Sequence, residues 1–407
     1  MDEARASALA GQLRAPRDAE RLDFWCHRFG ARPSEVAAAA AASTSDTPSA
    51  AVESAAAEAE LREKGVEEAP TRTPSACSTA SEVAIGPRFT REELEAIMQQ
   101  IAAEVLPWVS NYTFVKKLQE AERNQGRVEL MRDPKDDDKP LAVKVMPNEW
   151  VCHSHEEFRK THADSSEQPW ADLAILKKLN SLSFPYVCDF YKVYRDHRET
   201  YVATTFCSVG DLFAWVDRES VPRPGPDRER QMVPIVNQIF NAVRMLHDLG
   251  IAHRDLSLEN ILLTRSEPGS TEGEFAVKII DFGMAIFNQT CSEERGKLAY
   301  QAPEMHGGAA YDAFLADDFA LGVVLFGMAA QDYPWTSTKK SACQLFEYVC
   351  AFGFPRFLEH RRLRTGDGRL SDVFSPSLAE LLEGLLDFRV ERRAALGERA
   401  FASARGA

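Results

Sequence analysis

The chain of 407 residues is long enough for two or three domains, and its 44% hydrophobic and 27% charged residues are typical of globular proteins. The 62 acidic side chains outnumber the 48 basic ones and give a net charge of −14, which argues against a nucleic-acid-binding protein. No uninterrupted apolar run of about 18 residues occurs, so we expect no membrane span. The N-terminus lacks a basic and apolar leader, and the eight scattered cysteines lack metal or redox spacing. Both features favour a cytoplasmic or nuclear protein with reduced thiols.

The N-terminal 88 residues differ in composition from the rest of the chain. Residues 31–88 contain no aromatic side chain and consist mostly of Ala, Ser, Thr, Glu and Pro. Such a segment buries too little apolar area to offset the entropy lost on folding, so we predict a disordered N-terminal arm over residues 1–88. One cluster in it, Phe24, Trp25, His27 and Phe29, is either a fragment of amphipathic helix or a docking patch. The sequence does not identify a partner for this arm.

The predicted elements begin after the arm. Thr90 and Glu93 form a capping-box pattern, which predicts a leading helix through about Leu106 within a helix-and-linker segment over residues 89–111. Apolar alternation predicts strands over 112–118, 127–131, 141–146, 187–193 and 201–206, and a helical period covers 170–179. After Gly210 the pattern is mainly helical, with short β runs at 261–263 and 276–280. We therefore expect an α+β chain with a β-rich half followed by a helix-rich half.

Four motifs occur in a fixed order along the chain: Ala142-Val143-Lys144, His253-Arg254-Asp255-Leu256-Ser257-Leu258-Glu259-Asn260, Asp281-Phe282-Gly283 and Ala302-Pro303-Glu304. Together they match the signature set of protein kinases. From about Tyr112 to its end, the chain resembles the eukaryotic-type protein kinases, and serine/threonine kinases in particular. The resemblance implies a bilobal protein kinase domain over 112–407, with an N-lobe over about 112–206 and a C-lobe over about 207–407.

The resemblance also implies the chemistry, which is Mg-ATP-dependent phosphorylation of serine and threonine hydroxyls on proteins. Asp255 would accept the proton of the substrate hydroxyl. Asn260 and Asp281 would hold Mg²⁺, a cation that prefers oxygen ligands. Lys144 would contact the α- and β-phosphates of ATP.

Other residues would bind the nucleotide or support the site. By resemblance, backbone groups of Thr205 to Cys207 would pair with adenine and Asp211 would bind the ribose. The remaining expected ATP contacts are Leu118, Gly126, Val128, Ala142 and Leu262. The expected supporting residues are Asp172 as partner of Lys144 (with Glu167 as a less suitable substitute), Asp317 under the catalytic loop, and the pair of Glu304 with Arg393.

The sequence departs from the family pattern at several places. Only Gly126 remains of the glycine-rich phosphate loop, and Glu120 and Glu122 would repel ATP there. Asp172 replaces the usual glutamate and is one methylene shorter, so we expect its pair with Lys144 to be longer or bridged by water. Two further changes are Ser257, where serine/threonine kinases carry a lysine that touches the γ-phosphate, and Lys297, where many relatives have threonine. The alternative reading is a pseudokinase that binds nucleotide or acts as a scaffold.

Regulation and substrate choice yield two further hypotheses. Arg254 is the arginine that binds an activation-loop phosphate in many kinases, and Glu293 and Glu294 lie where that phosphate often sits. We expect these glutamates either to attract Arg254 and order the loop without phosphorylation or to be merely solvated. Asp211 and Glu259 occupy positions that bind basic side chains in arginine-directed kinases, which favours a protein substrate that is basic around the acceptor. An enzyme acting on small molecules is disfavoured.

Overall fold

The computed structural model describes residues 90–109, 112–121, 125–266, 273–364 and 368–396, all within the unit Ile85–Ala407. The predicted disordered arm, with its aromatic cluster at 24–29, lies outside the described residues. Its disorder therefore stays a prediction.

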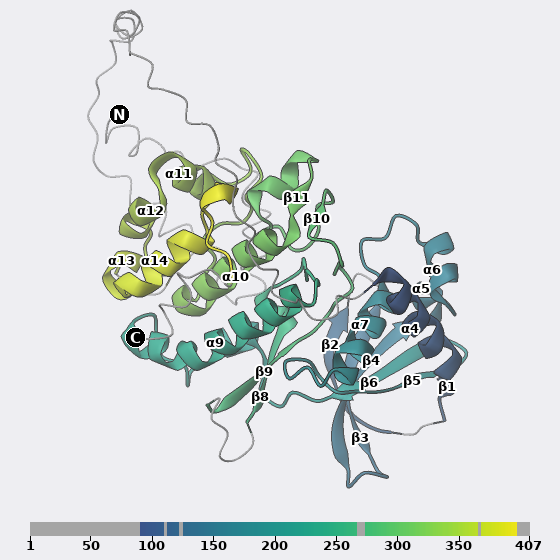
Figure 1. The fold of residues 1–407 in the computed structure, drawn as a ribbon. Helices are drawn as coiled ribbons and strands as arrows, with labels where there is room; N and C mark the ends of the chain where they lie inside the picture. Colours follow the sequence, from purple (N-terminus) through teal and green to yellow (C-terminus); the bar gives the residue numbers. More distant parts are fainter. Residues whose placement is uncertain (1–89, 110–111, 122–124, 267–272, 365–367, 397–407) are drawn as a thin grey trace, which may run out of the picture. The chain divides into compact units, whose positions relative to one another are not determined.

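A six-stranded sheet forms the N-terminal part of this unit (Figure 1). Its strand order is β1-β5-β6-β4-β3-β2. The strands are β1 (Leu106–Pro107), β2 (Thr113–Ala121), β3 (Gly126–Asp133), β4 (Lys139–Pro147), β5 (Phe190–Arg195) and β6 (Glu199–Thr205). Strands β2 to β6 pair antiparallel, whereas β1 pairs parallel with β5. The predicted strands are confirmed, although β5 begins three residues later than the apolar pattern suggested.

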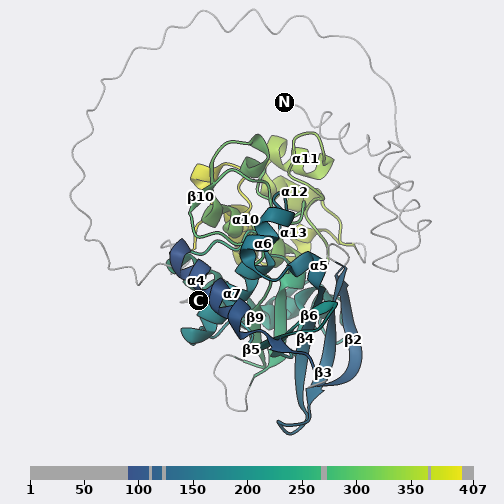
Figure 2. The same cartoon turned by 90° about the vertical axis from the view of Figure 1, so that its right-hand side faces the viewer.

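The helices of this part are α4 (Arg91–Glu104), α5 (Asn148–Val151), α6 (His155–Thr161) and α7 (Pro169–Ser181). The capping box is present, since Thr90 Oγ1 accepts from the Glu93 backbone and Glu93 Oε2 accepts from the Thr90 backbone. Helix α4 contacts α7 and lies beside it in both views (Figure 2). Its buried face consists of Leu94, Met98 and Ile101. Burial of each large apolar side chain contributes about 1.5–3 kcal/mol to stability, so this face stabilises the packing of α4 on α7.

Strand β4 presents its two faces to two different cores. Leu141, Val143 and Val145 belong to a small cluster with Tyr194 and Tyr201. Because successive side chains of a strand point to opposite faces, Ala142 and Lys144 point the other way. The period-two pattern therefore aims Lys144 at the face on which α7 lies.

The segment after α4 differs from the expected linker. The helix ends at Glu104, about two residues earlier than predicted, and Val105 is extended. Leu106 and Pro107 then pair with Tyr194 and Arg195 as an edge strand. Trp108 stacks on Tyr201 with ring centroids 4.1 Å apart and an interplanar angle of 6°. The segment therefore extends the sheet and covers its small aromatic core.

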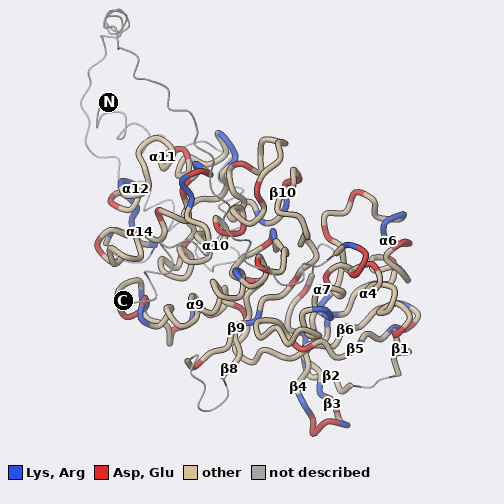
Figure 3. The backbone as a smooth tube through the Cα atoms, viewed as in Figure 1, with Lys and Arg blue, Asp and Glu red and all other residues tan. Residues whose placement is uncertain are grey.

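The C-terminal part is mostly helical. Its helices are α8 (Leu212–Val216), α9 (Pro226–Asp248), α10 (Ala313–Ala330), α11 (Gln344–Phe352), α12 (Phe354–His360), α13 (Leu370–Val373) and α14 (Pro376–Leu385). Its short strands are β7 (Gly210–Asp211), β8 (Ile261–Arg265), β9 (Phe275–Ile279), β10 (Thr290–Cys291) and β11 (Tyr311–Asp312), and 3-10 turns occupy Leu258–Asn260, Pro303–Gly307 and Val390–Arg392. The expected α+β fold with a β-rich lobe and a helical lobe is confirmed. Figure 3 shows Lys and Arg interspersed with Asp and Glu along the described chain.

Helix α10 is the core helix of the C-terminal part. Among the described residues it alone is long and apolar enough to cross a membrane by length and composition, with a mean hydropathy of 1.7, and 89% of it is buried inside the protein. Such burial is typical of the central helix of a folded domain. The burial also places two adjacent carboxylates, Asp317 and Asp318, in the protein interior.

Asp318 should make stability depend on pH. Burial raises the pKa of Asp318 to about 7 from an ordinary value of 3.8, against the opposing effect of His247. Its Oδ2 accepts from the Leu396 backbone, and its Oδ1 has no hydrogen-bond partner among the described residues. Between about pH 4 and pH 7 the folded state binds more protons here than the unfolded state, so the free energy of unfolding should fall by about 4 kcal/mol as pH rises.

The Asp318→Asn variant keeps an oxygen acceptor but does not titrate. We expect urea unfolding between pH 4.5 and 8, roughly the window of this titration, to show a much flatter pH dependence than in the unmodified chain. Asp248→Asn, at a carboxylate that is 67% exposed, is the matched control and should leave the slope unchanged. An equal slope in Asp318→Asn and the unmodified chain would exclude Asp318 as the source.

Candidate active site

The buried Asp317 of α10 accepts hydrogen bonds from the backbone of the loop that carries Asp255. Asp317 Oδ2 accepts from the His253 backbone at 2.7 Å, and Oδ1 accepts from the Arg254 backbone at 2.8 Å. Arg254 has a φ of +66°, a backbone conformation that costs free energy for any residue other than glycine. The two hydrogen bonds that Asp317 accepts hold this strained turn, which agrees with its expected place under the catalytic loop.

Asp255 and Asn260 contact each other directly. Asn260 Nδ2 donates to the Asp255 carbonyl at 2.7 Å and to Asp255 Oδ2 at 3.1 Å. Asp255 Oδ1 accepts from the Lys297 backbone at 3.2 Å. Asp255 is 6% exposed, and these contacts hold its carboxylate in one orientation, as a positioned proton acceptor requires.

Asp281 is tied to the same loop through its neighbour Ile280. The Ile280 backbone N–H donates to the Asn260 carbonyl at 3.0 Å, and its carbonyl lies 3.1 Å from His253 Nε2. Asp281 itself has a φ of +66°. Burial alone would raise the pKa of Asp281, but the positive charge of Lys144 and further groups hold it below its ordinary value. The side chain is therefore an anion at neutral pH.

Lys144 reaches Asp172 of α7 directly, with 3.2 Å between Nζ and Oδ2. The expected water bridge is therefore wrong, whereas the pair is longer than the roughly 2.7–2.9 Å usual for such charged contacts, as the other alternative predicted. The other oxygen, Asp172 Oδ1, accepts from the Phe282 backbone at 2.9 Å, so one carboxylate links β4, α7 and the Asp281-Phe282-Gly283 segment. The two contacts together fix the orientation of the Asp172 carboxylate. Burial would lower the pKa of Lys144, but the carboxylates of Asp172, Asp281 and Glu167 raise it well above its ordinary value.

Asp281 and Asn260 fit a divalent cation. A carboxylate and a primary amide supply hard oxygen donors, which suit Mg²⁺ or a similar ion that completes its coordination with phosphate and water. Both hydrogen bonds of Asn260 described above use its amide nitrogen, so the amide oxygen is the atom that would bind the cation. The described residues contain no cluster of three or more His, Cys, Asp or Glu side chains that could hold a metal by themselves.

The segment expected to bind adenine follows β6. The Thr205 backbone N–H already donates to the Asp189 carbonyl at 3.1 Å, and the Cys207 carbonyl accepts from the Gly210 backbone at 3.2 Å. Asp211, expected at the ribose, caps α8 by accepting from the Ala214 backbone at 2.7 Å. These contacts shape the segment, and the roles of its residues towards nucleotide stay predictions.

The remaining expected ATP contacts lie on β2, β3 and β4 of the N-terminal sheet and on β8 of the C-terminal part. Val128 is the cross-strand neighbour of Lys144, Ala142 pairs with Thr204, and Leu262 pairs with Asp211. Leu118, on β2, is 39% exposed. Gly126 pairs with Ala121 at the base of the phosphate loop, whose residues 122–124 lie outside the described residues. Glu120, expected to repel ATP, forms an ion pair with Lys117.

Glu293 contacts Arg254 in the segment between Asp281 and Glu304. Arg254 Nη2 lies 3.0 Å from the Glu293 carbonyl and 3.4 Å from its carboxylate. Glu294 instead lies 3.6 Å from His306. The attraction expected of both glutamates is therefore present for Glu293 and absent for Glu294.

Glu304 and Arg393 form the expected buried pair. Arg393 Nη1 lies 2.5 Å from Glu304 Oε1, and Nη2 lies 2.9 Å from Oε2. The Arg393 side chain is fully buried and that of Glu304 is 15% exposed. This pair ties the Ala302-Pro303-Glu304 segment to the end of the described chain.

A model of the protein kinase domain matches residues 124–401, more than half of the chain. The chain belongs to the protein kinase family. Three relatives illustrate the similarity: mitosis inducer protein kinase cdr1 of Schizosaccharomyces pombe, serine/threonine-protein kinase kin-29 of Caenorhabditis elegans and serine/threonine-protein kinase ksp1 of Schizosaccharomyces pombe. They are 29%, 31% and 33% identical over 220, 165 and 169 residues, which cover 53%, 40% and 40% of this chain.

The matched regions cover 32%, 18% and 35% of these three relatives, so the chain spans only a minor part of their length. The names of all three describe protein kinases and lend no support to the pseudokinase alternative. A protein kinase domain implies protein substrates, ATP and a divalent metal ion.

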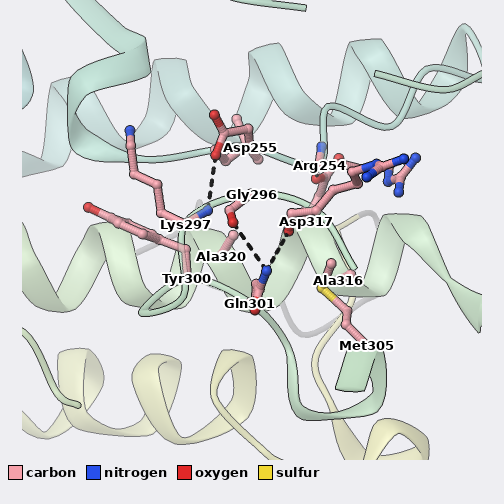
Figure 4. A pocket seen from close by; sticks show the side chains of 12 residues that line it. Arg254, Asp255, Gly296, Lys297, Tyr300, Gln301, Met305, Ala316, Asp317 and Ala320 are labelled. Carbon is pink, nitrogen blue, oxygen red and sulfur yellow. Dashed lines mark hydrogen bonds between the residues drawn. The ribbon is translucent and has the colours of Figure 1, made fainter. Parts of the chain in front are cut away.

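Two residues of this kinase have contacts that the sequence did not reveal. Gly296 has a φ of +83°, and a Cβ placed there would lie 2.6 Å from the Arg254 carbonyl, so the close approach of the two loops requires glycine. The next residue, Lys297, lies alongside Asp255 (Figure 4). The departure from threonine at position 297 was visible in the sequence, but the position of its ammonium group was not.

Proposed function

We propose that this kinase transfers the γ-phosphoryl group of ATP to serine and threonine hydroxyls of proteins with Mg²⁺ as the metal ion. The observation that carries the proposal is the linkage of the four residues: Asp255 contacts Asn260, Lys144 contacts Asp172, and the backbones on either side of Asp281 bond to Asn260 and Asp172. Lys144 and Asp172 come from the N-lobe, and the other residues come from the C-lobe. Serine/threonine kinases among the relatives support the choice of acceptor.

In the proposed reaction, the hydroxyl oxygen of the substrate bonds to the γ-phosphorus while the bond from that phosphorus to the β–γ bridging oxygen breaks. ADP leaves with the electron pair of the broken bond, and the hydroxyl proton passes to the Asp255 carboxylate. Asp281 and Asn260 would hold the divalent ion, and Lys144 would neutralise phosphate charge. Because phosphoryl transfer depends on placement and charge stabilisation, the fixed orientation of these four side chains is what the reaction needs.

Transfer of labelled phosphate from γ-labelled ATP to a mixed peptide library tests the proposal, with the acceptor residue identified afterwards. We expect labelled phosphoserine and phosphothreonine and no labelled phosphotyrosine. A folded chain that binds nucleotide but transfers no phosphate to any peptide or protein would be a pseudokinase.

We also propose a substrate that is basic around the acceptor residue. Asp211 and Glu259, the carboxylates expected to bind the basic side chains, already have contacts within the protein. Asp211 caps α8, and Glu259 Oε2 lies 3.3 Å from Lys297 Nζ. A basic substrate residue would therefore compete with Lys297 at Glu259. A peptide array in which acidic or proline-directed sequences are phosphorylated best would contradict this preference.

Because Glu293 contacts Arg254, we expect the kinase to be active when the segment between Asp281 and Glu304 is not phosphorylated. Glu293 contacts Arg254 at 3.4 Å and Arg295 at 3.3 Å through its carboxylate, and its carbonyl also accepts from Tyr311. Glu293→Gln removes the charge but keeps the backbone contacts, so we expect a partial loss of activity of about threefold to tenfold, because exposed ion pairs contribute little. Kinetics with phosphatase-treated protein measure this loss.

Glu294→Gln is the matched control, because Glu294 faces His306 and not Arg254. It should leave the rate unchanged. Inert dephosphorylated protein, or equal rates for Glu293→Gln and the unmodified chain, would contradict the role of Glu293.

We further propose a cytoplasmic or nuclear location. The six cysteines within the described residues are free thiols, which supports a reducing compartment. Fractionation of cells that produce the tagged chain tests this location, and recovery with secreted or membrane fractions would contradict it.

A further inference from the structure

Two departures from the family pattern meet in space although 40 residues separate them in the chain. Lys297 Nζ donates to Ser257 Oγ at 2.5 Å. Ser257 occupies the place of a lysine in serine/threonine kinases, and Lys297 occupies the place of a threonine in many relatives. Compared with the family pattern, a hydroxyl replaces the ammonium at position 257 and an ammonium replaces the hydroxyl at position 297. The Lys297 ammonium contacts the side chain of residue 257.

The position of Lys297 is set by its backbone as well as by its side chain. Its N–H donates to Asp255 Oδ1 at 3.2 Å, and its carbonyl accepts from the Tyr300 backbone at 2.9 Å. Tyr300 Oη in turn accepts from the Leu258 backbone at 3.2 Å. Figure 4 shows the Lys297 side chain running beside that of Asp255 and pointing the same way. The segment is thus held on the catalytic loop by contacts on both sides of Lys297.

The Lys297 ammonium has Glu259 as a second polar neighbour, and its side chain stays partly exposed. Nζ lies 3.3 Å from Glu259 Oε2, and the side chain is 31% exposed. Lys297 therefore lies beside the proposed proton acceptor. Lys144, the other lysine of the site, is paired with Asp172 on the N-lobe side.

We infer that Lys297 is a catalytic residue that binds the phosphoryl group in transfer and replaces the lysine missing at position 257. This inference rests on the proposed kinase activity. A lysine acts at phosphate as a point charge on a flexible stem, so its effect depends on where the ammonium lies and not on which residue carries it. An ammonium placed beside the proton acceptor stabilises the negative charge of the transferring group.

A cycle of variants tests the exchange. Lys297→Thr removes the ammonium, Ser257→Lys adds one at the family position, and the double variant restores the family arrangement. We expect Lys297→Thr to lower kcat by about 100- to 1,000-fold and the double variant to recover most of that loss. Lys297→Met, which keeps the length of the side chain, should behave like Lys297→Thr, and Lys339→Thr, at an exposed lysine elsewhere in the C-lobe, should be unaffected. Melting temperatures show which variants are folded.

Nucleotide affinity supplies a readout that is independent of turnover. Calorimetry with a non-hydrolysable ATP analogue and with ADP should show that Lys297→Thr weakens binding of the analogue by about tenfold or more, because a charge-assisted hydrogen bond to the γ-phosphate is lost. Binding of ADP should stay unchanged. If both nucleotides lose affinity equally, or if the double variant does not regain activity, Lys297 only supports the loop and the inference is overturned. If the unmodified chain neither binds nucleotide nor transfers phosphate, the proposed function itself fails.

Discussion

Replacing Asp255 with asparagine should lower the rate of phosphoryl transfer by about 100- to 10,000-fold, the usual contribution of a positioned general base. Asparagine matches aspartate in size and can still accept from the Lys297 backbone through its amide oxygen. It cannot accept the proton of the substrate hydroxyl at neutral pH. The loss should therefore fall on kcat, while the affinity for nucleotide is retained.

Steady-state kinetics of the purified chain measure this change, with the melting temperature as a check on folding. Asp248→Asn, at an exposed carboxylate of α9, is the matched control and should keep full activity. Retention of more than about a tenth of the activity by Asp255→Asn would lie well outside the expected range and would remove Asp255 as the proton acceptor.

Arg393→Met should destabilise the fold by about 3–5 kcal/mol, because it leaves the Glu304 carboxylate buried without its partner. Arg393 also donates to the Leu315 and Asp387 carbonyls, each at 3.0 Å, and lies 4.9 Å from the centre of the Phe319 ring. Removing the guanidinium thus leaves several acceptors unsatisfied. Denaturant unfolding should show a lower midpoint, and activity at low temperature should be affected much less.

Two comparisons sharpen this prediction. Arg389→Met removes an arginine that is 46% exposed, four residues earlier in the chain, and should change stability little. The double variant Arg393→Met with Glu304→Leu removes both charges and should recover part of the lost stability, since no buried charge is left unpaired. Similar unfolding midpoints for Arg393→Met and Arg389→Met would show that the pair of Arg393 with Glu304 contributes no more to stability than an exposed ion pair.

Local patterns predicted much of the fold and of the candidate site. The capping box located the start of α4 because both of its hydrogen bonds lie within one turn of helix. Alternation of apolar residues predicted the strand over 141–146 that carries Lys144, and β4 covers these residues. The motif spacing placed Asp255 and Asn260 five residues apart on one loop, and the structure shows them in direct contact.

Contacts between distant segments could not be predicted in the same way. The Asp172 carboxylate joins Lys144 to the Phe282 backbone, which lies 110 residues from Asp172 in the chain. Strand β1 is two residues long, too short to give any alternation. Glu294 lies beside His306 and not Arg254 because the geometry of the loop decides between two neighbouring glutamates. The meeting of Lys297 with Ser257 likewise depends on how two loops approach each other.

Calorimetric titration of the full chain with ATP, with and without Mg²⁺, tests whether the residues of the candidate active site form a metal-dependent nucleotide site. We expect saturable binding that requires the divalent ion and is lost in Asp281→Ala, because Asp281 is proposed to hold the metal beside the phosphates. Absence of binding by the folded chain at millimolar nucleotide and magnesium, or equal binding by Asp281→Ala, would contradict this expectation.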